Sequence, residues 1–167
     1  MFADALPESD LTAKAAGLPS GQDIFYRVIP QNLAEPSILG DAVVGRFRTA
    51  PSDNRSVSSV WSGDTAGQGW DINEEWGGVK AYATMLRQRP DFFIHSGDHV
   101  YADGPIKAEV RLKDGTLWTN LVTEEKSKPA KTLTEFGGQY KYNLLDRNLR
   151  AFNAQLPMFA QWDDHEK

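Results

Sequence analysis

Three stretches of the sequence place acidic residues directly after a hydrophobic run. Neighbouring carboxylates repel one another, and burying each of them without a partner costs roughly several kcal/mol. A bound cation resolves this conflict, and oxygen-rich sites suit Ca²⁺, Mg²⁺, Mn²⁺ or Fe³⁺. We therefore read these stretches as the ligands of a metal centre. The three are Gly63-Asp64, Gly97-Asp98 and Asp163-Asp164-His165.

Two cations held about 3.5–4 Å apart can activate water and clamp the oxygens of a phosphate group. His165 stands beside the last acidic pair, where it could stabilise a transition state or protonate a leaving alkoxide. Tyr101 follows Asp98 by three residues and is either a core aromatic or a phenolate ligand. His95 lies inside an apolar run, which favours a core histidine over a ligand.

The elements that must position these residues alternate between strand and helix. We expect strands at 57–62, 92–96 and 158–162, a helix over 78–89 that Pro90 ends, and a hairpin turn at 113–116. A second helix is expected from Pro129 to about Ala154, bent at Gly137-Gly138. This order predicts an α/β fold with a largely parallel sheet, in which strand carboxyl ends meet at one edge.

Residues 1–51 have a different character. Short strands are expected at 11–15, 24–28 and 43–49, separated by turn residues, and this pattern is typical of the end of a β-sandwich. We therefore predict two domains. Residues 1–51 would be the carboxy-terminal part of an immunoglobulin- or fibronectin-like sandwich, and 55–167 part of an α/β domain.

Composition excludes several classes of function. The net charge of −5 argues against a nucleic-acid-binding surface, and we interpret Lys126, Lys128 and Lys131 as solvated surface residues. The absence of cysteine excludes disulfides and thiolate ligands. No apolar run is long enough to span a membrane, and no secretion signal is visible at the start.

Three blocks of the sequence resemble motifs of the alkaline phosphatase D family, which belongs to the calcineurin-like metallophosphoesterases. Residues 92–106 (FFIHSGDHVYADGPI) resemble its GD-x-x-Y block. Residues 61–70 (WSGDTAGQGW) resemble its first metal block, and residues 161–166 (QWDDHE) resemble its W-D-D-H-E block. Residues 21–28 and 45–51 resemble the end of the family's amino-terminal β-sandwich.

The resemblance implies a role for each candidate residue. Asp98 would bridge two metal ions; Asp64 and Tyr101 would bind Fe³⁺; Asp164 would bind Ca²⁺; and His165 would act near the leaving group. The implied reaction is hydrolysis of phosphate monoesters or diesters by a metal-bound hydroxide. A monomer in the periplasm or secreted from the cell is also implied.

Some features depart from the family pattern. Certain members carry a cysteine in the first block, where this chain offers Asp64. The family's later histidine and Asp or Asn ligands do not occur before Lys167, so we expect this chain to be a fragment with little activity of its own. An alternative is a non-catalytic metal-binding or β-rich extracellular interaction module. A haloacid dehalogenase-type phosphatase ranks lower, because Ala66 stands where its second aspartate would be.

Overall fold

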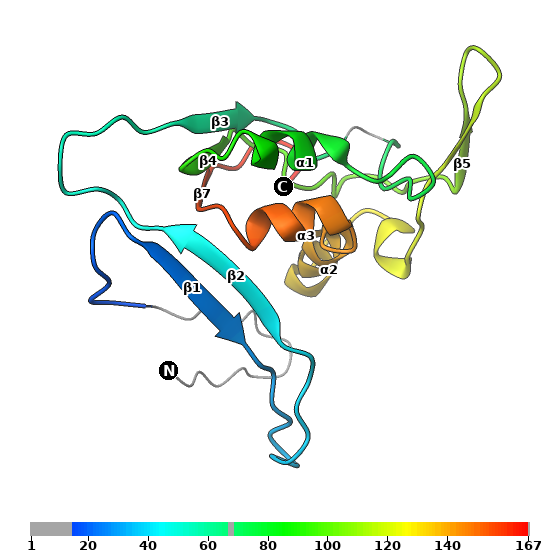
Figure 1. Ribbon diagram of the computed structural model, residues 1–167. Coiled ribbons are helices and arrows are strands. Elements are labelled where there is room, and N and C mark those ends of the chain that lie inside the picture. Colours follow the sequence, from blue (N-terminus) through cyan, green and yellow to red (C-terminus); the bar gives the residue numbers. More distant parts are fainter. Residues whose placement is uncertain (1–14, 67–68, 167) are drawn as a thin grey trace.

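The computed structural model describes residues 15–66 and 69–166. Its centre is a three-stranded parallel sheet with the order β3-β4-β7 (Figure 1). The strands are β3 (Ser59–Ser62), β4 (Phe92–His95) and β7 (Met158–Ala160). The parallel sheet and the flanking helices confirm the α/β interpretation.

One face of the sheet is covered by α1 (Lys80–Arg87) and α3 (Arg147–Asn153) (Figure 1). Their apolar side chains pack on the central strand, because aromatic and leucine side chains release the most free energy when they leave water. The buried cluster contains Tyr82, Phe93, Leu149, Phe152 and Leu156.

The helix expected from Pro129 to Ala154 is two helices, so that prediction was wrong. α2 spans Leu133–Asn143 and α3 begins again at Arg147. The break has a cap: the Asp146 side chain accepts hydrogen bonds from the backbone N–H groups of Asn148 and Leu149. Such a cap favours a fresh helix start over a continuous helix.

The bend expected at Gly137-Gly138 stays a prediction; α2 runs through both glycines as one helix, and it packs against a neighbouring segment at Gly138. A Cβ atom there would lie 2.6 Å from Cγ of Glu125, in the short 3-10 helix η1 (Glu124–Lys126). The glycine therefore allows α2 to approach η1 closely. Lys126, expected on the solvated surface, is instead buried with 1% of its area exposed, which corrects that interpretation.

Residues 15–51 contain an antiparallel pair, β1 (Asp23–Val28) and β2 (Val43–Arg48). These strands agree with two of the three expected in this region. The strand expected at 11–15 falls almost wholly outside the described residues. A sandwich is not seen in the described part, and the division into two domains stays a prediction.

The turn expected at 113–116 joins the hairpin strands β5 (Glu109–Arg111) and β6 (Leu117–Thr119). This hairpin projects away from the sheet (Figure 1). Among the described residues, no helix is both long and apolar enough to cross a membrane.

Candidate metal centre

The three acidic segments meet at the carboxyl edge of the parallel sheet. The loops after β3 and β4 are joined by two backbone hydrogen bonds: Asp64 N–H donates to Gly97 O at 3.1 Å, and Thr65 N–H donates to Asp98 O at 3.0 Å. The segment after β7 joins them through the N–H of His165, which donates to Oδ1 of Asp98 at 3.2 Å. The convergence expected of parallel strands is therefore present.

Asp64 and Asp98 both adopt positive φ, 54° and 56°. Few residues other than glycine adopt this left-handed conformation, although aspartate does so more readily than most. Each of these residues lies shortly after the end of its strand, where the chain leaves the sheet. Sparsely populated backbone conformations of this kind often occur at functional sites.

Asp98, Asp164 and His165 each offer a ligand atom, and these atoms all lie within 4.8 Å of one another. Asp98 is buried and Asp164 is exposed, so the group extends from the protein interior to the surface. Burial raises the pKa of Asp98, against the opposing effect of His165, and the carboxylates of Asp163 and Asp164 add a smaller upward effect. A cation at this point would reverse that effect.

Asp64 and Tyr101 form a second group beside the first. The Tyr101 hydroxyl donates a hydrogen bond to Oδ1 of Asp64. Burial raises the pKa of Tyr101, and the bond to Asp64 raises it further. The Tyr101 ring also stacks on the His165 ring, with 4.2 Å between centroids, which connects the two groups.

His165 is held by a partner that the sequence interpretation missed. Its Nδ1 lies 2.9 Å from Oδ2 of Asp103. Burial lowers the pKa of His165, but Asp103, Asp164 and Asp98 together outweigh this effect and raise it. Asp103 lies in the block 92–106, and its acidic side chain is the feature of the sequence that could have suggested this contact with His165.

Glu166 ties the third segment to the second. Its carboxylate accepts hydrogen bonds from the backbone N–H of His99 and, at 2.8 Å, from that of Asp163. The His99 carbonyl in turn accepts from the Asn143 side chain of α2 at 2.6 Å. Glu166 belongs to the block 161–166, but its spacing in the sequence does not indicate that it holds the second and third acidic segments together.

The buried Lys126 fixes the backbone at Tyr101. Its Nζ donates to the Tyr101 carbonyl at 3.2 Å and pairs with Oδ2 of Asp71, also at 3.2 Å. Burial raises the pKa of Asp71, and Lys126 opposes that effect. Removing one partner would leave the other charge buried alone, which is strongly unfavourable.

The donor set fits hard cations. Carboxylate oxygens are ligands for hard cations such as Ca²⁺ and Mg²⁺, whereas an imidazole suits iron and not Ca²⁺. A cavity of about 350 Å³ adjoins the centre and is lined in part by Tyr101 and Asp103. It offers space for a small molecule next to the candidate ligands.

A parallel α/β sheet with an acidic, histidine-containing group at its carboxyl edge defines an α/β protein with a candidate metal centre. The sequence model of the PhoD-like phosphatase family matches residues 60–167. Because this match covers more than half of the sequence, the chain belongs to the PhoD-like phosphatase family. The resemblance stated from the sequence is therefore confirmed.

Individual relatives agree with this assignment. Alkaline phosphatase D of Bacillus subtilis (strain 168) is 28% identical over 153 residues, covering 92% of this chain and 23% of the relative. A solved structure described as "Structure of PhoD" superposes with a TM-score of 0.62 at 24% identity, covering 89% of this chain and 25% of that one. At that identity the superposition supports the fold. The chain thus spans about a quarter of the length of these proteins.

Proposed function

We propose that this chain supplies ligands of a two-cation phosphoesterase centre, and that the full-length natural protein hydrolyses phosphate esters. Membership of the PhoD-like phosphatase family supports the reaction class. The observation that carries the proposal is the meeting of Asp98, Asp164 and His165 within 4.8 Å, next to the Asp64–Tyr101 pair.

In this proposal Asp98 would be a ligand of both cations. Asp64 and Tyr101 would hold the first, proposed to be Fe³⁺, and Asp164 the second, proposed to be Ca²⁺. The arrangement of the two groups around Asp98 supports this division. When bound, the cations would activate water and polarise the phosphate oxygens, as paired metal ions do in hydrolases.

The protein's own contribution would be orientation and a proton. The Asp103 carboxylate accepts a hydrogen bond from Nδ1–H of His165. This contact orients the ring and favours its protonated form. In the proposed reaction the imidazolium would donate its Nε2 proton to the leaving alkoxide. The Tyr101 ring stacked on His165 would keep the imidazole in place.

Three finer parts of the proposal follow from the family resemblance. The substrate would be a phosphate monoester or diester, the protein would work as a monomer, and its location would be periplasmic or secreted. Because the chain covers about a quarter of its relatives, we also propose that the 167 residues alone turn over little substrate.

The test is aryl-phosphate hydrolysis by the full-length natural protein after loading with Fe³⁺ and Ca²⁺. We expect activity, and we expect Asp98→Asn to reduce kcat/KM by at least about 10³-fold, because one shared ligand serves both cations. Asp114→Asn, at the exposed hairpin turn, is the matched control and should be silent. A folded, metal-loaded protein without phosphoesterase activity would refute the proposal.

A further inference from the structure

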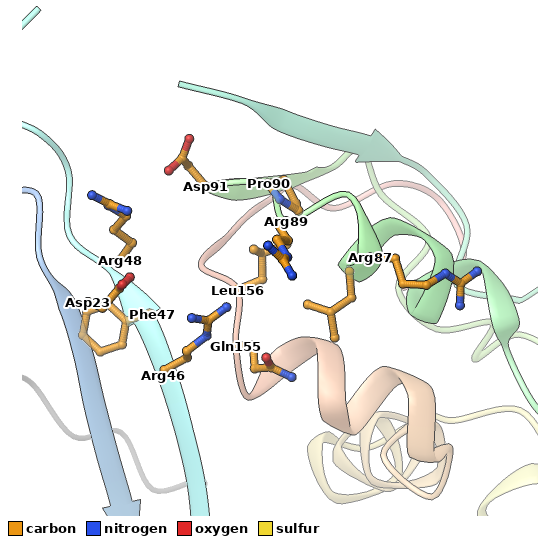
Figure 2. A pocket seen from close by; sticks show the side chains of 11 residues that line it. Asp23, Arg46, Phe47, Arg48, Arg87, Arg89, Pro90, Asp91, Gln155 and Leu156 are labelled. Carbon is orange, nitrogen blue, oxygen red and sulfur yellow. The ribbon is translucent and has the colours of Figure 1, made fainter. Parts of the chain in front are cut away.

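A second polar cavity lies at the opposite edge of the sheet from the candidate metal centre. Its volume is about 440 Å³, and it lies between β2 and the carboxyl ends of α1 and α3 (Figure 2). Pro90 and Asp91, which precede β4, form part of its wall. The metal-centre residues follow the other end of the same strand, so the two sites are separate.

Two arginines from different elements point into this space. Figure 2 shows Arg46 reaching across from β2 and Arg89 reaching toward it from the end of α1, with the Gln155 amide below them. The other arginines of the lining are directed elsewhere. Arg87 donates to Oγ1 of Thr84 at 2.9 Å, and Arg48 donates to the Gly21 carbonyl at 3.2 Å.

Within the described part of the chain, no ion pair joins Arg46 or Arg89 to a carboxylate. The ion pairs there join other residues. The lining also contains two carboxylates, Asp23 and Asp91. Asp91 accepts a hydrogen bond at Oδ2 from the N–H of Ser58 at 2.9 Å, and Asp23 lies on β1 opposite Arg48 in the strand pairing. Arg48 and Arg87 bond to neutral oxygen atoms and keep their charge, so the four arginines of the lining outnumber its two aspartates and leave a formal excess of positive charge.

Arg89 also occupies a position that favours glycine. Its φ is 52°, and it directly follows the Gln88 cap of α1, where helices commonly end in a left-handed glycine. An arginine there is less stable than glycine in the same conformation. Backbone conformations of this kind cluster at functional sites, which is consistent with a role for the Arg89 guanidinium.

Hydrogen bonds join the two walls of the cavity, the β1–β2 pair and the end of α3. Arg46 N–H donates to the Ala154 carbonyl at 2.8 Å, and the Tyr26 hydroxyl donates to the same carbonyl at 3.1 Å. Gly45 makes this approach possible, because a Cβ atom there would collide with that carbonyl oxygen. Arg46 therefore projects from a fixed backbone, which favours binding by reducing the ordering required.

We propose that this cavity binds the phosphate group of a small molecule. Two guanidinium groups and an amide offer the forked N–H donors that recognise phosphate oxygens. The cavity is larger than a single phosphate, so it also has room for the organic part of a small phosphate ester.

The experiment is calorimetric titration and thermal unfolding of the 167-residue chain in EDTA, which removes any cation-dependent phosphate binding. The probes are inorganic phosphate, glycerol phosphate and succinate. We expect both phosphates to bind and to raise Tm, with succinate at least about tenfold weaker. Tighter binding of glycerol phosphate identifies an ester as the ligand, and equal binding identifies the phosphate group alone.

Two variants test the residues. Arg46→Gln and Arg89→Gly should each weaken phosphate binding by about tenfold or more, which is the effect of losing a charged hydrogen bond. Arg89→Gly should also keep or raise Tm without ligand, since glycine suits its backbone. Arg87→Gln is the matched control and should bind like the wild type. Phosphate binding that Arg89→Gly leaves unchanged, or no phosphate binding at all, would overturn the proposal.

Discussion

The imidazole of His165 lies close enough to two carboxylates to serve as a cation ligand, yet its Nδ1 is also bonded to an acid. We assign it the role of proton donor, because Asp103 raises its pKa and so favours the protonated ring. A ligand would have to be neutral, so the two roles predict different consequences when the ring is removed.

The prediction concerns His165→Asn in the full-length natural protein. As a proton donor its loss should lower kcat by about 10²–10⁴-fold on alkyl phosphates, and far less on p-nitrophenyl phosphate, whose leaving group needs no proton. The Ca²⁺ affinity should change by less than about threefold. Equal losses on both substrates, together with weakened Ca²⁺ binding, would show that His165 is a ligand instead.

His95 is the buried histidine of β4, with 1% of its area exposed. Its Nε2 lies 3.1 Å from Oγ1 of Thr65, and its ring stacks on His99. The expectation of a core position is confirmed. Burial, and then the positive charge of His99, lower the pKa of His95 to about 4. The folded protein thus prefers the neutral ring, whereas the unfolded chain binds a proton near the ordinary value of 6.5.

This difference makes stability pH-dependent. Since the unfolded state binds the extra proton, stability is full above about pH 7 and is lost as the pH falls toward 4. By pH 5 the loss from His95 amounts to about 2 kcal/mol. We expect His95→Gln to flatten the fall in unfolding free energy between pH 7.5 and pH 5 by that amount, as measured by urea unfolding in EDTA. An unchanged slope would contradict this assignment.

At the scale of elements, the junction between the ends of β4 and β7 depends on Gly97. Its φ is 107°, and a Cβ atom there would lie 2.5 Å from Cβ of Asp163. Glycine allows the backbone to turn sharply at this position. The structure adds a second reason, which is the close approach of the segment that carries Asp164 and His165.

The substitution Gly97→Ala should therefore do more than strain the backbone. Gly115 is a suitable control, because its φ of 88° is also positive but nothing lies within 4 Å of its Cβ position. Gly115→Ala should cost about 1 kcal/mol, and Gly97→Ala about 2–4 kcal/mol. Only Gly97→Ala should also weaken Ca²⁺ binding. Equal costs in urea unfolding, with unchanged binding, would refute this role.

Several elements could be read from the sequence because their signals are local. The strands β4 and β7 are short, largely apolar runs, β3 carries the β-prone pair Val60-Trp61, and the turn of the β5–β6 hairpin carries an Asp-Gly pair. The break before α3 was missed because the apolar spacing continues through it. Asp146 signals a cap only when its buried position and its bond to Val79 N–H of another segment are known.

The same distinction holds for the site. Asp64, Asp98 and Asp164 could be selected because each follows an apolar run, and Tyr101 because of its motif. Lys126 was misjudged as a surface residue, since its partners Asp71 and Tyr142 lie 55 and 16 residues away in sequence. A buried charge is recognisable only from contacts of this kind, which one sequence does not reveal.

At the scale of the whole molecule, the sheet is covered on one side only within the described residues. The opposite face carries a cross-strand row of apolar side chains in register, Trp61 beside Ile94 and Ile94 beside Phe159. Their exposed fractions are 70%, 39% and 64%. An apolar row of this kind favours association in the isolated chain, so the proposed experiments need a check for the monomer.

The central claim is that acidic groups from three segments share cations at one edge of the sheet. The most direct measurement is titration of the 167-residue chain with Ca²⁺ and Fe³⁺, comparing wild type with Asp98→Asn and with the exposed control Asp114→Asn. We predict that Asp98→Asn weakens the binding of both cations by at least about tenfold, while the control binds as wild type does. Equal affinities in all three proteins would contradict the account.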